Sequence, residues 1–284
     1  MKVVGLVSSP RKGGNSEIAV KEIFRQLPAD WEKEMIRVNE LNINYCTACY
    51  ACVPEGARCR QKDDFNFLVD KIKEADKVVI AAPTYILGCH TAIKMVMDRL
   101  ISLVADYNSF KKADCVIVSS YGYGGWEGMV KEDMQLFAKK LHLNVIGHEV
   151  MLATLPGDTV KGENLEKITG LANLLINGAD GPIKPTTKGI ECPICASTGF
   201  QVNPDGSVRC MLCSVEGKFM HGPGGLRFEY DPEFNHKFTN KSLDDHVQYL
   251  IDKKDLFLAT RGEIKALQAE YAELDWWVTP APKE

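Results

Sequence analysis

The chain alternates short apolar runs with amphipathic segments, and this pattern restricts its fold more than any other feature. Five apolar runs are typical of buried strands: 2–8, 34–38, 77–83, 114–120 and 144–152. Five segments have the apolar spacing of helices: 16–27, 63–76, 91–104, 127–141 and 164–179. Strands that alternate with helices predict an α/β domain in which helices cover both faces of a parallel sheet.

The order of the strands can also be predicted. Because right-handed crossovers leave few topologies for five strands, we predict a doubly wound, five-stranded parallel sheet of the flavodoxin-like type over residues 1–182. Ligands of such sheets bind beyond the carboxyl ends of the strands. The segments that directly follow the strands are therefore the first candidates for a site.

The loop after the first strand, "SSPRKGGNSE" (8–17), is rich in serine and glycine and leads directly into a helix. Glycines let the backbone approach an anion, while helix N-terminal N–H groups and an arginine favour phosphate. The alternative is an ordinary polar turn in which Asn15 or Ser16 caps the helix. The loop lacks the G-x-G-x-x-G pattern, which disfavours a Rossmann dinucleotide site.

Two further loops follow the third and fourth strands. The first, "APTYILGCHTAIK" (82–94), offers a backbone turn, a threonine and a tyrosine, and the second, "SYGYGGWEG" (120–128), combines glycines with aromatic side chains. Such loops suit a flat aromatic ligand that is held by backbone amides and ring contacts. The alternative is that these are two ordinary loops whose aromatic residues have no role in binding. Three candidate loops at one sheet edge favour a ligand.

Eight of the ten cysteines fall into two groups, which indicates metal sites in a reducing compartment rather than disulfides. The first group, in the loop 45–60, consists of Cys46, Cys49, Cys52 and Cys59. Four thiolates in so short a loop match the ligand set of a [4Fe–4S] cluster, and the steps of three residues favour it. Tetrahedral zinc is the competing interpretation. Arg58 and Arg60 are candidates for offsetting the charge of a cluster.

The second group consists of Cys192, Cys195, Cys210 and Cys213. Two C-x-x-C knuckles joined by a hairpin with the turn "NPDG" predict a zinc ribbon over residues 188–220. An iron site of the rubredoxin type uses the same ligands, but the short spacer and the second knuckle, "CMLC", favour zinc. Three positive side chains balance three negative ones over this range, so we expect no nucleic acid as a partner.

The three loops, in their order along the chain, resemble the FMN-binding loops of the flavodoxin-like NAD(P)H-dependent FMN reductases. With the cysteine loop after the second strand, roughly the first 180 residues resemble the iron–sulfur flavoproteins of that family, which carry FMN and a [4Fe–4S] cluster. The resemblance implies that the phosphate and ribityl chain of FMN are held by Ser9, Arg11, Gly14, Asn15 and Ser16. It implies that the isoalloxazine is faced on one side by Pro83, Thr84, Tyr85 and Gly88 and on the other by Gly124, Gly125 and Glu127.

The remaining chain is predicted to be a small module and an extension. A segment rich in glycine, proline and threonine (178–189) separates the first domain from the ribbon. The extension (221–284) is predicted to be irregular at first and then helical near 242–254 and 257–275. These helices suit packing on the same chain or on another subunit, and we expect a homo-oligomer, a dimer or a tetramer.

Net charge and hydropathy restrict the surroundings of the protein. The net charge of −4 gives no global attraction to nucleic acid or to anionic membranes, and no apolar window is long enough for a membrane helix. We therefore expect no membrane partner and a cytoplasmic location.

The predicted function is that of an FMN-dependent oxidoreductase, or electron-transfer flavoprotein, that passes electrons between FMN and a [4Fe–4S] cluster, with Zn²⁺ in the ribbon. The expected partner is a redox protein or NAD(P)H. No catalytic side chain is predicted, because the flavin carries the redox chemistry. The alternative within enzymes is an NAD(P)H-dependent FMN or quinone reductase whose metal sites are structural only. An alternative of another class is a metal- or redox-responsive regulator that uses the ribbon for binding.

Overall fold

The main domain is built on a parallel sheet with the strand order β2-β1-β3-β5-β6. The computed structural model describes all residues except 54–56, 180–188, 273–275 and 277–284. The five strands are β1 (Lys2–Val7), β2 (Glu32–Arg37), β3 (Lys77–Tyr85), β5 (Asp114–Tyr121) and β6 (Asn144–Leu152). The short strand β4 (Gly88–Cys89) folds back antiparallel on the end of β3. This is the flavodoxin-like order, so the predicted fold class is confirmed.

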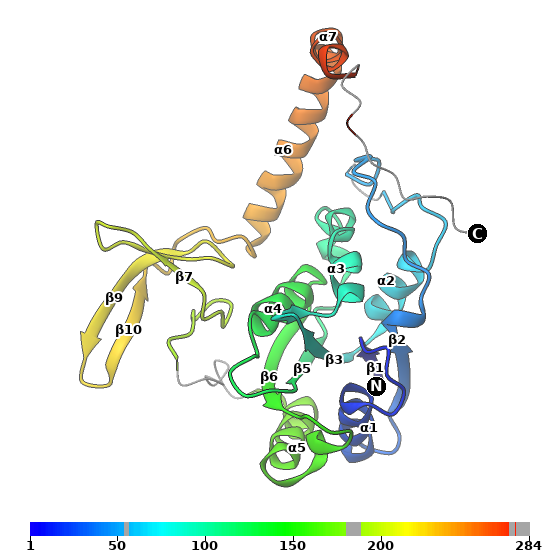
Figure 1. The fold of residues 1–284 in the computed structure, drawn as a ribbon, viewed down its shortest axis with the longest axis vertical. Helices are drawn as coiled ribbons and strands as arrows, with labels where there is room; N and C mark the ends of the chain where they lie inside the picture. The colour runs from blue at the N-terminus through cyan, green and yellow to red at the C-terminus, as the bar shows by residue number, and fades with distance from the viewer. Residues whose placement is uncertain (54–56, 180–188, 273–275, 277–284) are drawn as a thin grey trace.

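Helices cover both faces of the sheet, as the apolar runs of its strands require (Figure 1). The five helices of this domain are α1 (Asn15–Gln26), α2 (Phe65–Glu74), α3 (Thr91–Met97), α4 (Val130–Lys140) and α5 (Gly162–Asn177). One apolar core lies under α1 and α5, and the other lies under α2, α3 and α4. Helix α1 packs so closely on β1 that a Cβ atom at Gly5 would lie 2.5 Å from Val20 Cγ1, and only glycine fits at this position.

The helix predicted over 91–104 is shorter than expected. It ends at Met97, and a 3₁₀ turn (Leu100–Leu103) follows. The break between the two is the place where the Arg99 side chain turns into the interior, where it is 1% exposed. A polar contact inside the protein has thus overridden the apolar spacing, which continues through Val104.

The small module is a four-stranded antiparallel sheet with the order β10-β9-β8-β7. Its strands are β7 (Phe200–Val202), β8 (Val208–Cys210), β9 (Glu216–Gly222) and β10 (Gly225–Tyr230). The prediction of an irregular stretch after 220 is therefore wrong for the β9–β10 hairpin. Its turn contains Pro223 and Gly224, and Gly225 has a φ of +99°, which only glycine adopts without strain. The predicted boundary at 178–189 lies largely outside the described residues.

The module docks on the first turn of α4. Glu132 Oε1 accepts hydrogen bonds from the backbone N–H and the hydroxyl of Thr198, at 2.9 and 2.8 Å. Beside it, Lys131 Nζ lies 2.6 Å from Glu191 Oε1, and both side chains are buried. These polar contacts fix the module against the main domain.

Two helices end the described chain, as predicted, and they project away from the sheet (Figure 1). They are α6 (Asn240–Ala259), which Thr239 caps, and α7 (Arg261–Ala272). Leu243 is the buried residue of α6, and α7 has none. Among the described helices, none is both long and apolar enough to cross a membrane.

Candidate functional site

A cavity of about 190 Å³ lies at the carboxyl edge of the main sheet. It is lined by Ser9, Arg11, Gly14, Asn15, Ser16, Pro83, Thr84, Tyr85, Ser120, Tyr121, Gly122, Ala153 and Thr154. These residues come from the carboxyl ends of β3 and β5, from the segments that follow β1, β5 and β6, and from the start of α1. The position is the one that parallel sheets offer to ligands.

The cavity brings together eight of the residues that the resemblance assigned to FMN: Ser9, Arg11, Gly14, Asn15, Ser16, Pro83, Thr84 and Tyr85. The other four do not line it: Gly88, Gly124, Gly125 and Glu127. Gly88 instead lies in β4, where a Cβ atom would meet Asp133. Five lining residues were not assigned to FMN. Ser120, Tyr121 and Gly122 lie in the segment 120–128 that the sequence had already singled out, whereas Ala153 and Thr154 were missed altogether. They directly follow the fifth strand, so the same search at that strand would have found them.

The chemistry of this cavity suits a phosphorylated, hydroxyl-rich ligand. Gly14 is the N-cap of α1 and provides no capping side chain, which leaves the first N–H groups of the helix without an internal cap. Arg11 is exposed beside them. Thr84 Oγ1 is buried and has no hydrogen-bond partner among the described residues. A buried hydroxyl of this kind normally bonds a ligand or water, so the residues present fit FMN.

A buried carboxylate holds the first loop in shape. Glu17 Oε2 accepts a hydrogen bond from Gly13 N–H at 2.7 Å and forms an ion pair with Arg37 at 2.6 Å. Arg37 donates a second hydrogen bond to the carbonyl oxygen of Ser9 at 3.2 Å. Asn15 donates from Nδ2 to the carbonyl oxygen of Ala153, so its side chain joins two of the lining loops.

We expect the contribution of Glu17 to stability to depend on pH. Hydrogen bonds from Lys21, Arg37 and Gly13 N–H lower its pKa to about 2. A lowered pKa stabilises the folded protein above the ordinary carboxyl pKa, and this gain is lost as the pH falls toward 2. Glu17→Gln should therefore cost about 1–3 kcal/mol of unfolding free energy at pH 7 and progressively less below about pH 4.

Urea unfolding of the wild type and of Glu17→Gln at pH 7, 5 and 3.5 measures this difference. The control variant is Glu32→Gln, because Glu32 is exposed. Its difference in unfolding free energy from wild type should not decrease as the pH falls. A difference between Glu17→Gln and wild type that stays constant from pH 7 to pH 3.5 would contradict the assignment.

The cysteine loop encloses a second cavity of about 190 Å³. All four predicted thiols line it, together with Arg99 and Ile101 from the turn after α3. The thiols do not behave alike: hydrogen bonds from Ala51 N–H and Thr47 lower the pKa of Cys49, whereas burial raises that of Cys52.

The loop is closed by polar contacts at its ends. Gln61 Nε2 donates to the carbonyl oxygen of Tyr45 at 2.9 Å, and Asn66 Nδ2 donates to that of Cys59 at 2.8 Å. Of the two arginines that the sequence pointed to, Arg58 pairs with Asp70 at 2.8 Å, while the charge of Arg60 helps to lower the pKa of Cys49. The arginine in contact with a cysteine sulfur is Arg99, whose Nη2 lies 3.0 Å from Cys59 Sγ.

The thiols of the small module are arranged differently. Cys192, Cys195, Cys210 and Cys213 are buried, and their sulfurs all lie within 4.8 Å of one another. Among the described residues, this is the group of cysteine, histidine and acidic side chains close enough to share one ion. A four-sulfur shell of this size suits a single tetrahedral metal. The wider cysteine loop suits a cluster, in which each thiolate binds a different iron atom.

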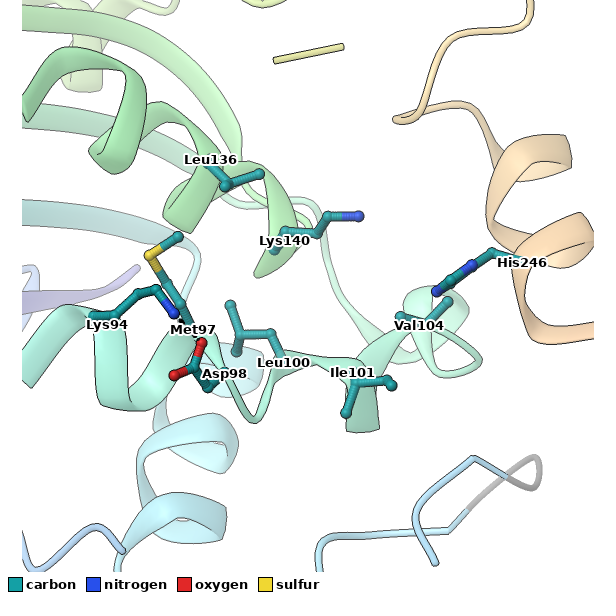
Figure 2. Close-up of a pocket in the computed structure, with 9 residues that line it drawn as sticks. All are labelled: Lys94, Met97, Asp98, Leu100, Ile101, Val104, Leu136, Lys140 and His246. Atoms are coloured by element: carbon teal, nitrogen blue, oxygen red, sulfur yellow. Dashed lines mark hydrogen bonds and ion pairs between the residues drawn. The ribbon is translucent and has the colours of Figure 1, made fainter. Parts of the chain in front are cut away.

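A further cavity of about 340 Å³ lies between α3, the turn after it, α4 and α6 (Figure 2). Its wall is mainly apolar, from Met97, Leu100 and Val104, and His246 closes it from α6. It shares Asp98 and Ile101 with the cavity of the cysteine loop. None of the predicted site residues lines it.

Comparison with known proteins agrees with this geometry. The family described as NADPH-dependent FMN reductase matches residues 1–156, which is more than half of the chain. The chain belongs to the NADPH-dependent FMN reductase family. It is therefore a flavin-dependent oxidoreductase, as predicted from the loops.

Within the FMN reductase family, the chain is similar to proteins named iron–sulfur flavoproteins. One from Archaeoglobus fulgidus is 29% identical over 194 residues, covering 67% of this chain and 87% of the relative. Another, from Methanocaldococcus jannaschii, is 32% identical over 139 residues, which are 48% of this chain and 72% of the relative. The resemblance to this branch of the FMN reductases is thus confirmed.

A solved structure has a fold similar to that of this chain. The structure described as flavone reductase superposes with a TM-score of 0.71 at 20% identity, covering 100% of both chains. At this identity the likeness concerns the fold.

Proposed function

We propose that this FMN reductase binds FMN in the cavity at the sheet edge and a [4Fe–4S] cluster at Cys46, Cys49, Cys52 and Cys59, and that electrons pass between them. The observation that carries the proposal is that all four loop thiols line one cavity in a chain whose relatives are named iron–sulfur flavoproteins. We further propose Zn²⁺ at the four thiols of the small module. Eight thiolates kept as ligands require a reducing compartment, and we propose the cytoplasm.

The residues of the chain have distinct tasks in this proposal. FMN, when bound, supplies two-electron and one-electron redox chemistry. Arg11 and the N–H groups at the start of α1 hold its phosphate, and Glu17 and Arg37 keep that loop in shape. Thr84 offers its free hydroxyl, and Tyr85 covers the ring region. No side chain needs to transfer a proton for the flavin to exchange electrons with a cluster.

The proposal also includes redox partners and a second subunit. NAD(P)H or a redox protein supplies or accepts the electrons. The cavities for FMN and for the cluster have no lining residue in common, so we propose that a neighbouring subunit brings the two cofactors together in a homo-oligomer. The exposed apolar side chains of α6 and α7, such as Tyr249, Leu256 and Tyr271, support such an assembly.

Anaerobic purification of the full chain with excess FMN and iron tests the proposal. One bound FMN, about four iron atoms and one zinc atom per chain are expected, with a cluster-type absorbance. Protein that binds FMN but only zinc, at both cysteine groups, would instead be a flavin reductase with structural metals. Protein without flavin absorbance would contradict the FMN site itself.

A double variant tests the FMN residues. Because an arginine–phosphate hydrogen bond is worth about 1.5–3 kcal/mol, replacing Arg11 and Ser16 by alanine should weaken FMN binding by about tenfold to a hundredfold or more. Thermal unfolding of the apoprotein should change little. The neighbouring Lys12→Ala is the matched control, because Lys12 is exposed and does not line the cavity. Equal FMN affinity of the double variant and the control would contradict the assignment.

A further inference from the structure

The most unusual polar group outside the FMN cavity is a buried ion pair between Arg99 and Asp63. Their side chains are 1% and 0% exposed. A guanidinium stays protonated in proteins, and the Asp63 carboxylate is stabilised by Arg99 and by two backbone N–H donors. The pair is therefore ionised, and one of its members faces the cysteine loop.

Stability alone does not account for such a pair. Replacing a buried ion pair by apolar side chains of similar volume is often neutral or stabilising, so a buried pair is weak support for a fold. Arg99 directs Nη1 to oxygen atoms, those of Asp63 and of the Asn44 carbonyl. Its Nη2, however, lies 3.0 Å from Cys59 Sγ, a sulfur that is 40 residues away in the sequence.

The surroundings of Arg99 fix this contact from several sides. Asp63 accepts hydrogen bonds from the backbone N–H groups of Asn44 and Phe65, at 2.8 and 3.2 Å. The Phe65 ring lies against the guanidinium, with its centroid 4.2 Å from Cζ. Arg99 is thus held between an aromatic ring and a carboxylate, which leaves its planar fork little freedom.

The fork has one further donor. Nε of Arg99 is buried and has no hydrogen-bond partner among the described residues. Because Arg99 also lines the cavity of the four thiols, the guanidinium presents donors to the region that a cluster and its ligands would occupy. Hydrogen bonds to the sulfurs of a cluster are among the main determinants of its reduction potential.

We propose that Arg99, oriented by Asp63, is a positioning residue that donates a hydrogen bond to the Cys59 thiolate and thereby raises the reduction potential of the [4Fe–4S] cluster. This inference rests on the proposed cluster at the four loop cysteines. Reduction adds one electron to the cluster, and the added negative charge is stabilised by a donor and a positive charge at its ligand. The protein thereby favours the reduced cluster as an electron store.

The test is a redox titration of the anaerobically reconstituted full chain, in which the paramagnetic signal of the reduced cluster is measured at each potential. In Arg99→Gln the electron equilibrium should shift about tenfold toward the oxidised cluster, which is a fall of about 59 mV for a one-electron couple. Arg99→Lys keeps the charge but not the planar fork, so a smaller fall is expected. Arg25→Gln is the control and should leave the potential unchanged, because Arg25 is exposed on α1 and pairs with Glu22.

A second readout separates this role from a merely structural one. In the wild type, the hydrogen bond from Arg99 weakens the bond between iron and the Cys59 sulfur. Resonance Raman spectra of Arg99→Gln, which lacks this hydrogen bond, should therefore show an iron–cysteine stretching band at higher frequency. If Arg99→Gln does not retain a cluster, the same two measurements on Arg99→Lys decide the question. If the reduction potential and the Raman spectrum of the Arg99 variants equal those of the wild type, the role of Arg99 is contradicted while the proposed function stands. Wild-type protein without iron at the loop would overturn the proposed function and this inference with it.

Discussion

Cys210→Ser is expected to unfold the small module while the main domain stays folded. Cys210 is fully buried among the other three thiols, and a structural zinc contributes about 10–16 kcal/mol of folding free energy in small domains at pH 7. The apolar core of the module is small and consists mainly of the four cysteines, Val208, Val215 and Phe228. Without metal it cannot compensate for the entropy of ordering the chain.

Limited proteolysis with metal analysis measures this effect. The variant should lose its zinc and be cut within 189–238, whereas residues 1–177 should remain resistant and retain FMN. Cys115→Ala is the matched control, because Cys115 is buried in β5, away from both cysteine groups. Iron in place of zinc at these thiols, or a protected module in Cys210→Ser, would contradict the assignment.

Cys49→Ser is expected to lower the iron content from about four atoms per chain to less than one, because a [4Fe–4S] cluster is held by four thiolates and the variant offers only three. Cys49 is the loop cysteine whose pKa is lowered by its hydrogen bonds, so it is prepared to bind as a thiolate. The paramagnetic signal on reduction should disappear with the iron. FMN binding should stay unchanged, since the two cavities share no residue.

The control for this variant is Cys89→Ser. Cys89 is half-buried and outside both groups, and burial together with Asp133 raises the pKa of its thiol to about 12. It is therefore a poor metal ligand at neutral pH, and its loss should leave the iron content at the wild-type level. Stoichiometric zinc bound to the four loop thiolates of anaerobic wild-type protein would contradict the prediction.

The sheet and most of its ligand cavity could be predicted because they depend on local sequence. Apolar runs define parallel strands, and the loops at their carboxyl ends must meet at one edge. This reasoning places Ser9, Thr84 and Tyr85 at one cavity although they are far apart in the chain. The same reasoning was not applied to the segment after β6, and for that reason Thr154 was missed.

Contacts between distant side chains could not be predicted in the same way. Arg99 sits in an amphipathic pattern that favours an exposed position, and only the packing of α2 against the turn after α3 brings it to Asp63 and Cys59. The apolar spacing also extended the third helix beyond Met97, because periodicity contains no information about a buried charge that turns the backbone. In the small module, glycine and proline near 223 concealed a hairpin whose alternation is visible only in the register of β9 and β10.

The docking of the small module on α4 has a consequence for the biosynthesis of the chain. The acceptor, Glu132, lies 66 residues before its partner Thr198, so the receiving surface leaves the ribosome well before the module does. Domains generally fold from the N-terminus during synthesis, and the main domain can form while the second cysteine group is still being translated. The zinc proposed at that group can then bind only after the main domain has left the ribosome. A cell short of zinc would accumulate a protein whose main domain is folded and whose small module is not.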